Sequence, residues 1–234
     1  MLESLRRCCD SLLILDTETS GLSFSRDEII EYAAVKLAWQ NDTLVTVAEA
    51  DEFIRTTDDR RLPPKIVELT GITDELLRDE GITKQAFCGL LAEMLTPRTM
   101  ILAYNAQFDL LFLYHFLSKH GDARLLQDKP KLDLLTVYRD RRPYPHKLCS
   151  AIEAYGLQDK VRNSHRAIDD VRATVEVLKA MEAERSDLDR YVDLFGYSAR
   201  YGVSGPRIRS VRYAPQGYDN AAPLYELVLS DCAR

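Results

Sequence analysis

The sequence predicts an α/β fold in which a mixed sheet is flanked by helices. Segments with strand-like composition are concentrated in the first 54 residues. Segments with helical spacing of apolar residues dominate from residue 83 onward. Strands grouped early and helices grouped late are typical of a sheet whose faces are covered by helices. No internal repeat or low-complexity tract indicates a repeat architecture.

The first predicted strand is the apolar run at residues 12–15, which leads into the polar sequence of residues 16–19. A short run of this kind is typical of a buried strand that delivers polar side chains at its carboxyl end. Residues 28–37 and 44–54 are predicted to form two further strands, joined by a turn-prone tripeptide at residues 40–42. The fold is therefore expected to begin with an antiparallel meander.

The two prolines at residues 63–64 end the strand pattern, and helix signals follow them. Thr73 or Asp74 can cap a helix that begins after a turn at Gly71. Residues 100–104 are predicted to form a further strand. The remaining predicted helices span residues 83–95, 106–120, 147–155 and 167–183.

The chain has a net charge of −6, which argues against a protein that coats nucleic acid through bulk positive charge. An enzyme that holds a strand end through metal ions can still be acidic overall. No run approaches the roughly 20 apolar residues that span a bilayer, and residues 1–10 do not resemble a signal peptide. The five cysteines show neither a disulfide framework nor a zinc-site spacing. We therefore expect a cytoplasmic protein without a membrane partner.

The composition of the chain changes after about residue 185. Residues 196–218 contain four arginines, four tyrosines and no acidic residue. We therefore predict a domain at residues 1–185 and a basic, aromatic extension at residues 186–234. Because arginines can follow phosphates and tyrosines can stack on unpaired bases, the extension is interpreted as part of a single-strand path. A tail that packs on the acidic body or at a dimer contact is an equally open interpretation.

Acidic residues lie at two places where a strand ends. Asp16 and Glu18 are two residues apart on the first predicted strand, so their side chains leave the same face and can converge on one cation. Oxygen ligands of this type suit Mg²⁺ or Mn²⁺. Asp109 lies at a junction of strand and helix, where a carboxylate can face a site. Taken singly, each is better explained by solvation at a strand end or by a helix dipole.

His165, Asp169 and Asp170 surround the start of the last predicted helix. A lone histidine at such a place is usually a cap or a surface residue, and both aspartates can complement the helix dipole. The two aspartates are adjacent in a helix, so they cannot both point the same way. The acidic and histidine-containing segments therefore indicate a function only in combination.

In combination, these segments resemble the motifs of the DEDDh, or DnaQ-like, family of 3′-to-5′ exonucleases, which includes the proofreading subunit of bacterial DNA polymerase III and ribonuclease T. Residues 16–22 match the first motif, residues 105–109 match the second, and residues 165–170 match the third. Residues 69–74 are similar to a family loop that contacts the terminal nucleotide. The resemblance covers residues 11–183 and implies a ribonuclease H-like mixed sheet of about five strands.

The resemblance implies a metal-dependent exonuclease that releases nucleoside 5′-monophosphates with the help of two Mg²⁺ or Mn²⁺ ions. It assigns His165 the role of general base and leaves Asp169 as a structural residue. Tyr104 is a departure, because many relatives have histidine before the asparagine of the second motif. The implied metal ligands, which are also catalytic residues, are Asp16, Glu18, Asp109 and Asp170. The implied substrate contacts are Thr17, Thr19, Leu22, Gly71, Ile72, Asn105 and Phe108.

Two other functions compete with this interpretation. A catalytically idle module of the same fold could hold nucleic acid or attach to a polymerase, but such a module would be expected to lack a carboxylate. Another metal-dependent nuclease of ribonuclease H-like fold could act inside a strand, but His165 together with the first two motifs favours the 3′ end. The sequence leaves single-stranded DNA and RNA open as substrates. A DNA polymerase partner and a homodimer are open as well.

Overall fold

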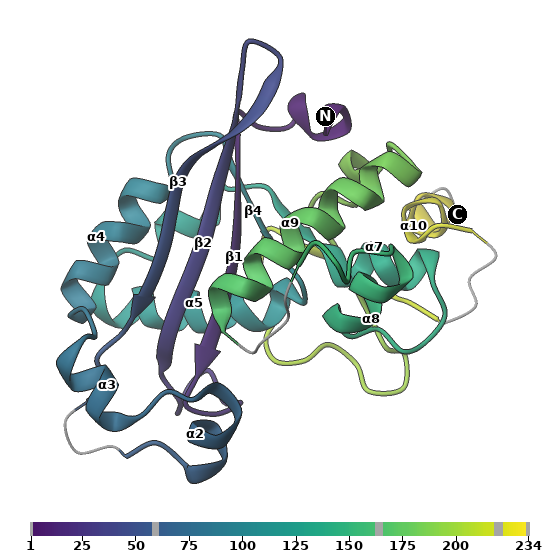
Figure 1. The fold of residues 1–234 in the computed structure, drawn as a ribbon. Coiled ribbons are helices and arrows are strands. Elements are labelled where there is room, and N and C mark those ends of the chain that lie inside the picture. The colour runs from purple at the N-terminus through teal and green to yellow at the C-terminus, as the bar shows by residue number, and fades with distance from the viewer. Residues whose placement is uncertain (1, 58–60, 162–165, 218–221, 233–234) are drawn as a thin grey trace.

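The computed structural model describes residues 2–57, 61–161, 166–217 and 222–232. Its centre is a mixed five-stranded sheet with the strand order β3-β2-β1-β4-β5. Helices cover both faces of this sheet (Figure 1), so the predicted α/β architecture is confirmed. Within the described part of the chain, no helix is both long enough and apolar enough to cross a membrane.

The sheet begins with the predicted antiparallel meander. The strands β1 (Ser11–Thr19), β2 (Ile29–Gln40) and β3 (Thr43–Phe53) pair in the order of the sequence. The turn between β2 and β3 places Asn41 and Asp42 at φ angles of 48° and 67°, a left-handed conformation that these two residue types tolerate. Parallel pairing with β1 then adds β4 (Thr99–Ala103) and, beyond it, β5 (Lys131–Asp133).

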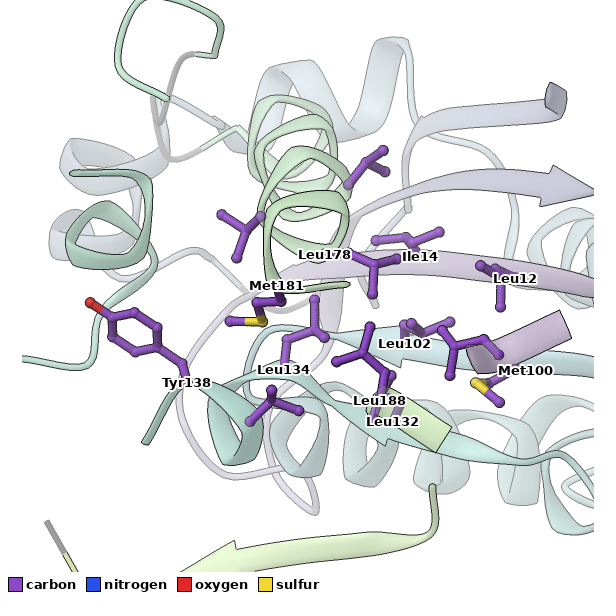
Figure 2. Close-up of a cluster of buried hydrophobic side chains, with 14 of the residues drawn as sticks. Leu12, Ile14, Met100, Leu102, Leu132, Leu134, Tyr138, Leu178, Met181 and Leu188 are labelled. Carbon is purple, nitrogen blue, oxygen red and sulfur yellow. The ribbon is translucent and has the colours of Figure 1, made fainter. Parts of the chain in front are cut away.

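The apolar residues of β1 divide the core between the two faces of the sheet. Leu12 and Ile14 pack in the cluster that includes α9 (Ala167–Glu184), whereas Leu13 and Leu15 point to the opposite face. This alternation follows from the period of two in a strand, and burial on both faces explains why the run is apolar without interruption. Figure 2 shows the first cluster, in which side chains of α9 meet those of β1 and β4.

The second face of the sheet is covered by two helices whose positions the sequence predicts. α5 (Ala106–His120) has the predicted bounds. α4 (Lys84–Met94) starts one residue late because Thr83 is its N-cap and accepts a hydrogen bond from the backbone N–H of Ala86 (3.1 Å). Other confirmed helix predictions are α3 (Asp74–Asp79), which is capped by Thr73, and α8 (Leu148–Ala154).

Several short elements are absent from the sequence prediction. Most of them span four residues or fewer, which is too few for a period to be recognised. The helices among them are α1 (Glu3–Arg6), α6 (Arg124–Gln127), α7 (Leu134–Arg141), the 3₁₀ helix η1 (Leu188–Tyr191) and α10 (Leu224–Cys232). The strands among them are β5, β6 (Leu194–Tyr197) and β7 (Arg212–Pro215). The helix signals after the prolines at residues 63–64 correspond to α2 (Pro64–Thr70), which ends at Gly71.

The described part of the C-terminal segment packs on the body of the protein. β6 and β7 pair in parallel, and the backbone N–H of Asp193 donates to the carbonyl oxygen of Lys131 at 2.8 Å. Leu194 and Phe195 belong to the same two buried clusters that cover the faces of the main sheet. The predicted boundary near residue 185 stays a prediction.

Candidate active site

The carboxyl end of β1 carries Asp16 and Glu18, both half-buried. β1 is the middle strand of the sheet, with β2 and β4 on its two sides. Directly opposite Glu18 in the register lies Glu31 of β2. Asp16, Glu18 and Glu31 therefore bring three carboxylates together along the edge of the sheet at which β1 ends.

Asp109 reaches the same edge from the first turn of α5. Its Oδ1 accepts a hydrogen bond from the backbone N–H of Thr17 (3.0 Å) and a second from the Thr17 hydroxyl (2.8 Å). The Asp109 side chain is only 3% exposed. These two bonds join the start of α5 to the end of β1. Thr17, predicted as a substrate contact, is therefore buried and bound to Asp109.

Asp133, at the end of β5, fixes the start of α5. Its Oδ1 accepts hydrogen bonds from the backbone N–H groups of Asn105 (3.0 Å) and Ala106 (3.1 Å). Asn105 has a left-handed φ of 74°, which turns the chain from β4 into α5. Asp133 also accepts from the backbone N–H of Leu135 (3.2 Å), so it caps α7 as well. This one buried carboxylate thereby holds the segment that carries Asp109.

Glu31 fixes the start of α9 in a similar way. Its fully buried carboxylate accepts a hydrogen bond from Nε of Arg166 (2.8 Å) and another from the backbone N–H of Ala167 (3.2 Å). The Arg166 guanidinium group also packs over the ring of Phe53, 5.0 Å from its centroid. α9 therefore starts at the edge that carries Glu18, and Asp170 lies in its first turn.

Glu31 and Asp133 were not predicted from the sequence. Glu31 could have been found, because a glutamate inside the apolar segment of residues 29–35 indicates a buried carboxylate that needs a partner. Asp133 carries no comparable signal, since β5 has only three residues and begins with Lys131. The functions of both residues depend on backbone groups that are distant in the sequence.

The predicted substrate contacts lie in different environments around this edge. Leu22, in the loop after β1, is 87% exposed. Ile72 is 1% exposed and packs with Ile30. It follows Gly71, whose left-handed φ of 73° suits glycine. The hydroxyl of the buried Thr19 donates to the carbonyl oxygen of Gly21 (2.7 Å).

Asn105 is exposed, and Phe108 is half-buried with its ring centroid 4.9 Å from that of Phe112. Tyr104, the departure from the family pattern, donates its hydroxyl to the carbonyl oxygen of His146 (3.0 Å). His165, the predicted general base, lies outside the described residues. The structure therefore describes every predicted site residue except this histidine.

The predicted metal ligands influence each other electrostatically. Burial, followed by the charges of Asp109 and Asp170, holds the pKa of Asp16 well above its usual range. Burial, followed by the charge of Glu31, raises the pKa of Glu18 to about 8, and burial raises the pKa of Asp109 to about 7. Carboxylates with pKa values raised in this way lack a compensating positive charge. A divalent cation among them would supply that charge.

The chemistry of these donors fits a hard divalent cation, because all of them are carboxylate oxygens. Among the residues that the structure describes, no three carboxylate, imidazole or thiol side chains already form a metal cage. The side chains would therefore have to draw together around an ion. Arg166 supplies positive charge at this edge, but its guanidinium group is bound to Glu31.

The raised pKa values predict that the metal-free protein loses stability as the pH rises from about 5 to about 8. The pKa of the Glu18 carboxyl is raised from 4.5 to about 8. Between these values the folded protein retains a proton that the unfolded chain has released, so the free energy of unfolding falls with increasing pH. We expect the melting temperature in chelator to fall by about 5 °C across this range.

Circular dichroism melts between pH 5 and pH 9 test this expectation. Because carboxylate ligands bind metal in their deprotonated form, added Mg²⁺ should raise the melting temperature more at pH 8 than at pH 5. A metal-free melting temperature that climbs from pH 5 to pH 8 would contradict the raised pKa values of these carboxyl groups.

The sequence of this chain is similar to an exonuclease family model and to chains of bacterial DNA polymerase III. The family model RNase_T, described as exonuclease, matches residues 13–178. The PolC-type DNA polymerase III of Clostridium perfringens is 31% identical over 171 residues, which are 73% of this chain and 11% of the polymerase. The chain thus spans about a tenth of the length of that relative. The DNA polymerase III subunit epsilon of Treponema pallidum is 30% identical over 73% of this chain and 76% of that subunit.

The fold is similar to that of solved exonuclease structures. E. coli exonuclease I in complex with a dA16 oligonucleotide superimposes with a TM-score of 0.68 at 24% identity, over 78% of this chain and 42% of that chain. A zinc-bound form of the complex between that exonuclease and single-stranded DNA gives a TM-score of 0.67 at 26% identity, with the same coverage of 78% and 42%. The ribonuclease H-like sheet expected from the sequence is therefore confirmed.

Proposed function

Because this chain belongs to the exonuclease family that the RNase_T model describes, we propose that it removes nucleotides one at a time from the 3′ end of single-stranded DNA or RNA. The observation that carries this proposal is the gathering of Asp16, Glu18 and Asp109 at the carboxyl end of β1, with Asp170 beside them in the first turn of α9. The products would be nucleoside 5′-monophosphates and a shortened strand.

We propose that these four carboxylates hold two Mg²⁺ or Mn²⁺ ions. Such ions, when bound, neutralise the charge that builds on the attacking and leaving oxygens of a phosphodiester and lower the pKa of water. The raised pKa values of Asp16 and Glu18 support the assignment, because both side chains are stabilised in their charged form once a cation is near. The similarity to a zinc-bound exonuclease complex supports it further.

His165 is the proposed general base, which accepts a proton from the attacking water. An imidazole is suited to this role because its unperturbed pKa is about 6.5. The neighbouring residue Arg166 is bound to Glu31 of β2, so the chain enters α9 at a fixed place beside the carboxylates. This anchored start of α9 supports the proposed role, because His165 directly precedes Arg166 in the sequence.

The terminal nucleotide is proposed to contact the segments that surround the end of β1. Leu22 is exposed on the loop after β1, so its side chain is available to pack against a base. Ile72 is buried, so its contact would come from the backbone next to Gly71. The other proposed contacts are Thr17, Thr19, Asn105 and Phe108.

DNA is the first substrate to test, because the similar proteins include DNA polymerase III chains and an exonuclease in complex with a DNA oligonucleotide. The same relatives support a DNA polymerase as a proposed partner. The phosphodiester itself does not separate the two nucleic acids, since a protein distinguishes RNA by contacts to the 2′-hydroxyl. The direct test therefore uses both DNA and RNA.

The direct test uses 5′-labelled single-stranded DNA and RNA of equal sequence, incubated with Mg²⁺, Mn²⁺ or chelator. We expect a ladder of products that shortens from the 3′ end only when metal is present. His165→Ala should slow this release by about a hundredfold or more, because general-base catalysis contributes about 10²- to 10⁴-fold. His120→Ala is a matched control, since His120 is exposed at the end of α5 and its ring only contacts that of Phe116, 5.0 Å away between centroids.

Two results would contradict the proposal. Cleavage inside the strand would indicate an endonuclease. Binding of both strands without any hydrolysis, by a folded wild-type protein in Mg²⁺ and Mn²⁺, would indicate a catalytically idle binding module of the same fold.

A further inference from the structure

The loop between β6 and β7, residues 198–211, combines positive charge with exposed aromatic surface. It carries Arg200, Arg207 and Arg209, all exposed, and contains no acidic residue. Tyr201 is 76% exposed, and the Arg200 guanidinium group lies over its ring, 5.3 Å from the centroid. Among the residues that the structure describes, none of the three arginines forms an ion pair with a carboxylate. In a chain of net charge −6, this is a local concentration of positive charge.

The β6–β7 loop is fixed to the start of α5. The side-chain amide of Gln107 donates to the backbone carbonyls of Ser204 (3.0 Å) and Pro206 (2.9 Å). The Gln107 carbonyl oxygen accepts a hydrogen bond from the Tyr213 hydroxyl (2.7 Å). Gln107 lies between Asn105 and Asp109 in the sequence. The loop is therefore bound to the same helical turn that carries the proposed active-site carboxylate.

A second contact places the loop against the segment that follows β1. Gly205 has a left-handed φ of 80°, and a Cβ atom there would lie 2.7 Å from Leu111 of α5 and 3.7 Å from the ring of Phe24. Phe24 lies two residues after the exposed Leu22. In Figure 1 the loop runs along the same lower side of the molecule as the carboxyl end of β1. The loop therefore adjoins two segments of the proposed nucleotide site.

The loop leads from this site to a hollow further along α5. The hollow has a volume of about 520 Å³ and is lined by Leu111, Tyr114, Arg207 and Arg209 among others, with Asp128 as the carboxylate in its lining. From Asn105 to Leu111 the helix rises by about 9 Å, at roughly 1.5 Å per residue. That length corresponds to two or three nucleotides of a stacked strand at about 3.4 Å each.

We propose that the β6–β7 loop binds the single strand upstream of its 3′-terminal nucleotide, with guanidinium groups on phosphates and Tyr201 stacked on a base. Arginines neutralise phosphate charge regardless of sequence, and tyrosine rings stack on any unpaired base. This inference rests on the proposed function for the position of the 3′ end. The loop would set the affinity for longer strands and leave hydrolysis of the terminal bond unchanged.

The test measures binding by fluorescence anisotropy, using 16-nucleotide single-stranded DNA and RNA in chelator at several salt concentrations. Arg200→Gln/Arg209→Gln should weaken binding about tenfold at low salt and reduce the slope of log K against log salt by about 1.4, at roughly 0.7 per phosphate contact. Tyr201→Ala should weaken binding about tenfold with little change in slope. The double variant Arg6→Gln/Arg98→Gln is the control, because it removes the same charge from residues paired with Asp42 and Asp10.

A second measurement separates this inference from the proposed function. The nitrophenyl ester of thymidine 5′-monophosphate offers the terminal bond without an upstream strand, so all variants should hydrolyse it at the wild-type rate in Mg²⁺. If the wild-type protein hydrolyses neither this ester nor any strand, the proposed function fails, while the binding data still report on the loop. If the loop variants bind both strands as the wild type does, or if the wild type binds neither at low salt, the inference is overturned. If the loop variants lose binding to only one of the two strands, the inference is supported, and the result shows whether the loop binds DNA or RNA.

Discussion

Asp16→Asn should abolish release of mononucleotides, with a loss of rate of about a thousandfold or more. Asparagine has nearly the same shape as aspartate but lacks the negative charge that a divalent cation requires. The same substitution should raise the melting temperature of the metal-free protein by a few degrees at pH 8. At that pH a charged Asp16 is destabilised by burial and by the neighbouring carboxylates, and a neutral Asp16 must take up a proton.

The combination of lost activity and increased stability separates a ligand role from a structural one, because a structural residue loses both when it is replaced. Asp10→Asn is the matched control. Asp10 precedes β1 at its other end, and its side chain is 67% exposed and paired with Arg98. The control should retain activity and stability, since exposed ion pairs contribute only about 0–1 kcal/mol. An Asp16→Asn protein with more than a tenth of the wild-type rate would exclude Asp16 from the metal site.

Glu31→Gln should reduce the rate of mononucleotide release by about 10- to 100-fold, although Glu31 belongs to none of the family motifs. Its carboxylate holds Arg166 and the first N–H of α9. Loosening this start displaces Asp170 in the first turn of α9, and misplacement by about 1 Å is sufficient for losses of this size. When the rate is measured as a function of Mg²⁺ concentration, the variant should also need more Mg²⁺ than the wild type for half-maximal activity.

Thermal unfolding distinguishes this positioning role from a general loss of stability. Burial raises the pKa of Glu31 despite its hydrogen bonds, so the charged form is costly in the folded protein and a neutral glutamine should change stability little. Glu49→Gln is the matched control, because Glu49 pairs with Arg172 of the same helix but at an exposed position. A Glu31→Gln protein that works within twofold of the wild-type rate at every Mg²⁺ concentration would show that Arg166 and Ala167 do not need this anchor.

Local patterns identified the parts of the fold that are long and periodic. The apolar run of β1, the meander that follows it, and the helix at residues 106–120 are where the sequence places them. The reason is physical: an element that buries one or both faces must repeat apolar residues at its own period. Asp16, Glu18 and Asp109 were recognisable because each lies where such an element ends or begins.

The sequence by itself thus determined the α/β class, the helices on the two faces of the sheet and the carboxylates that the family motifs contain. Only the tertiary structure decided what holds those carboxylates in place. Glu31 and Arg166 are 135 residues apart, and Asp133 caps α5 from 28 residues away. The β6–β7 loop likewise meets the start of α5 through Gln107, 97 residues before Ser204. A buried charge or backbone group is satisfied by whichever partner the fold brings near, and no local period records that partner.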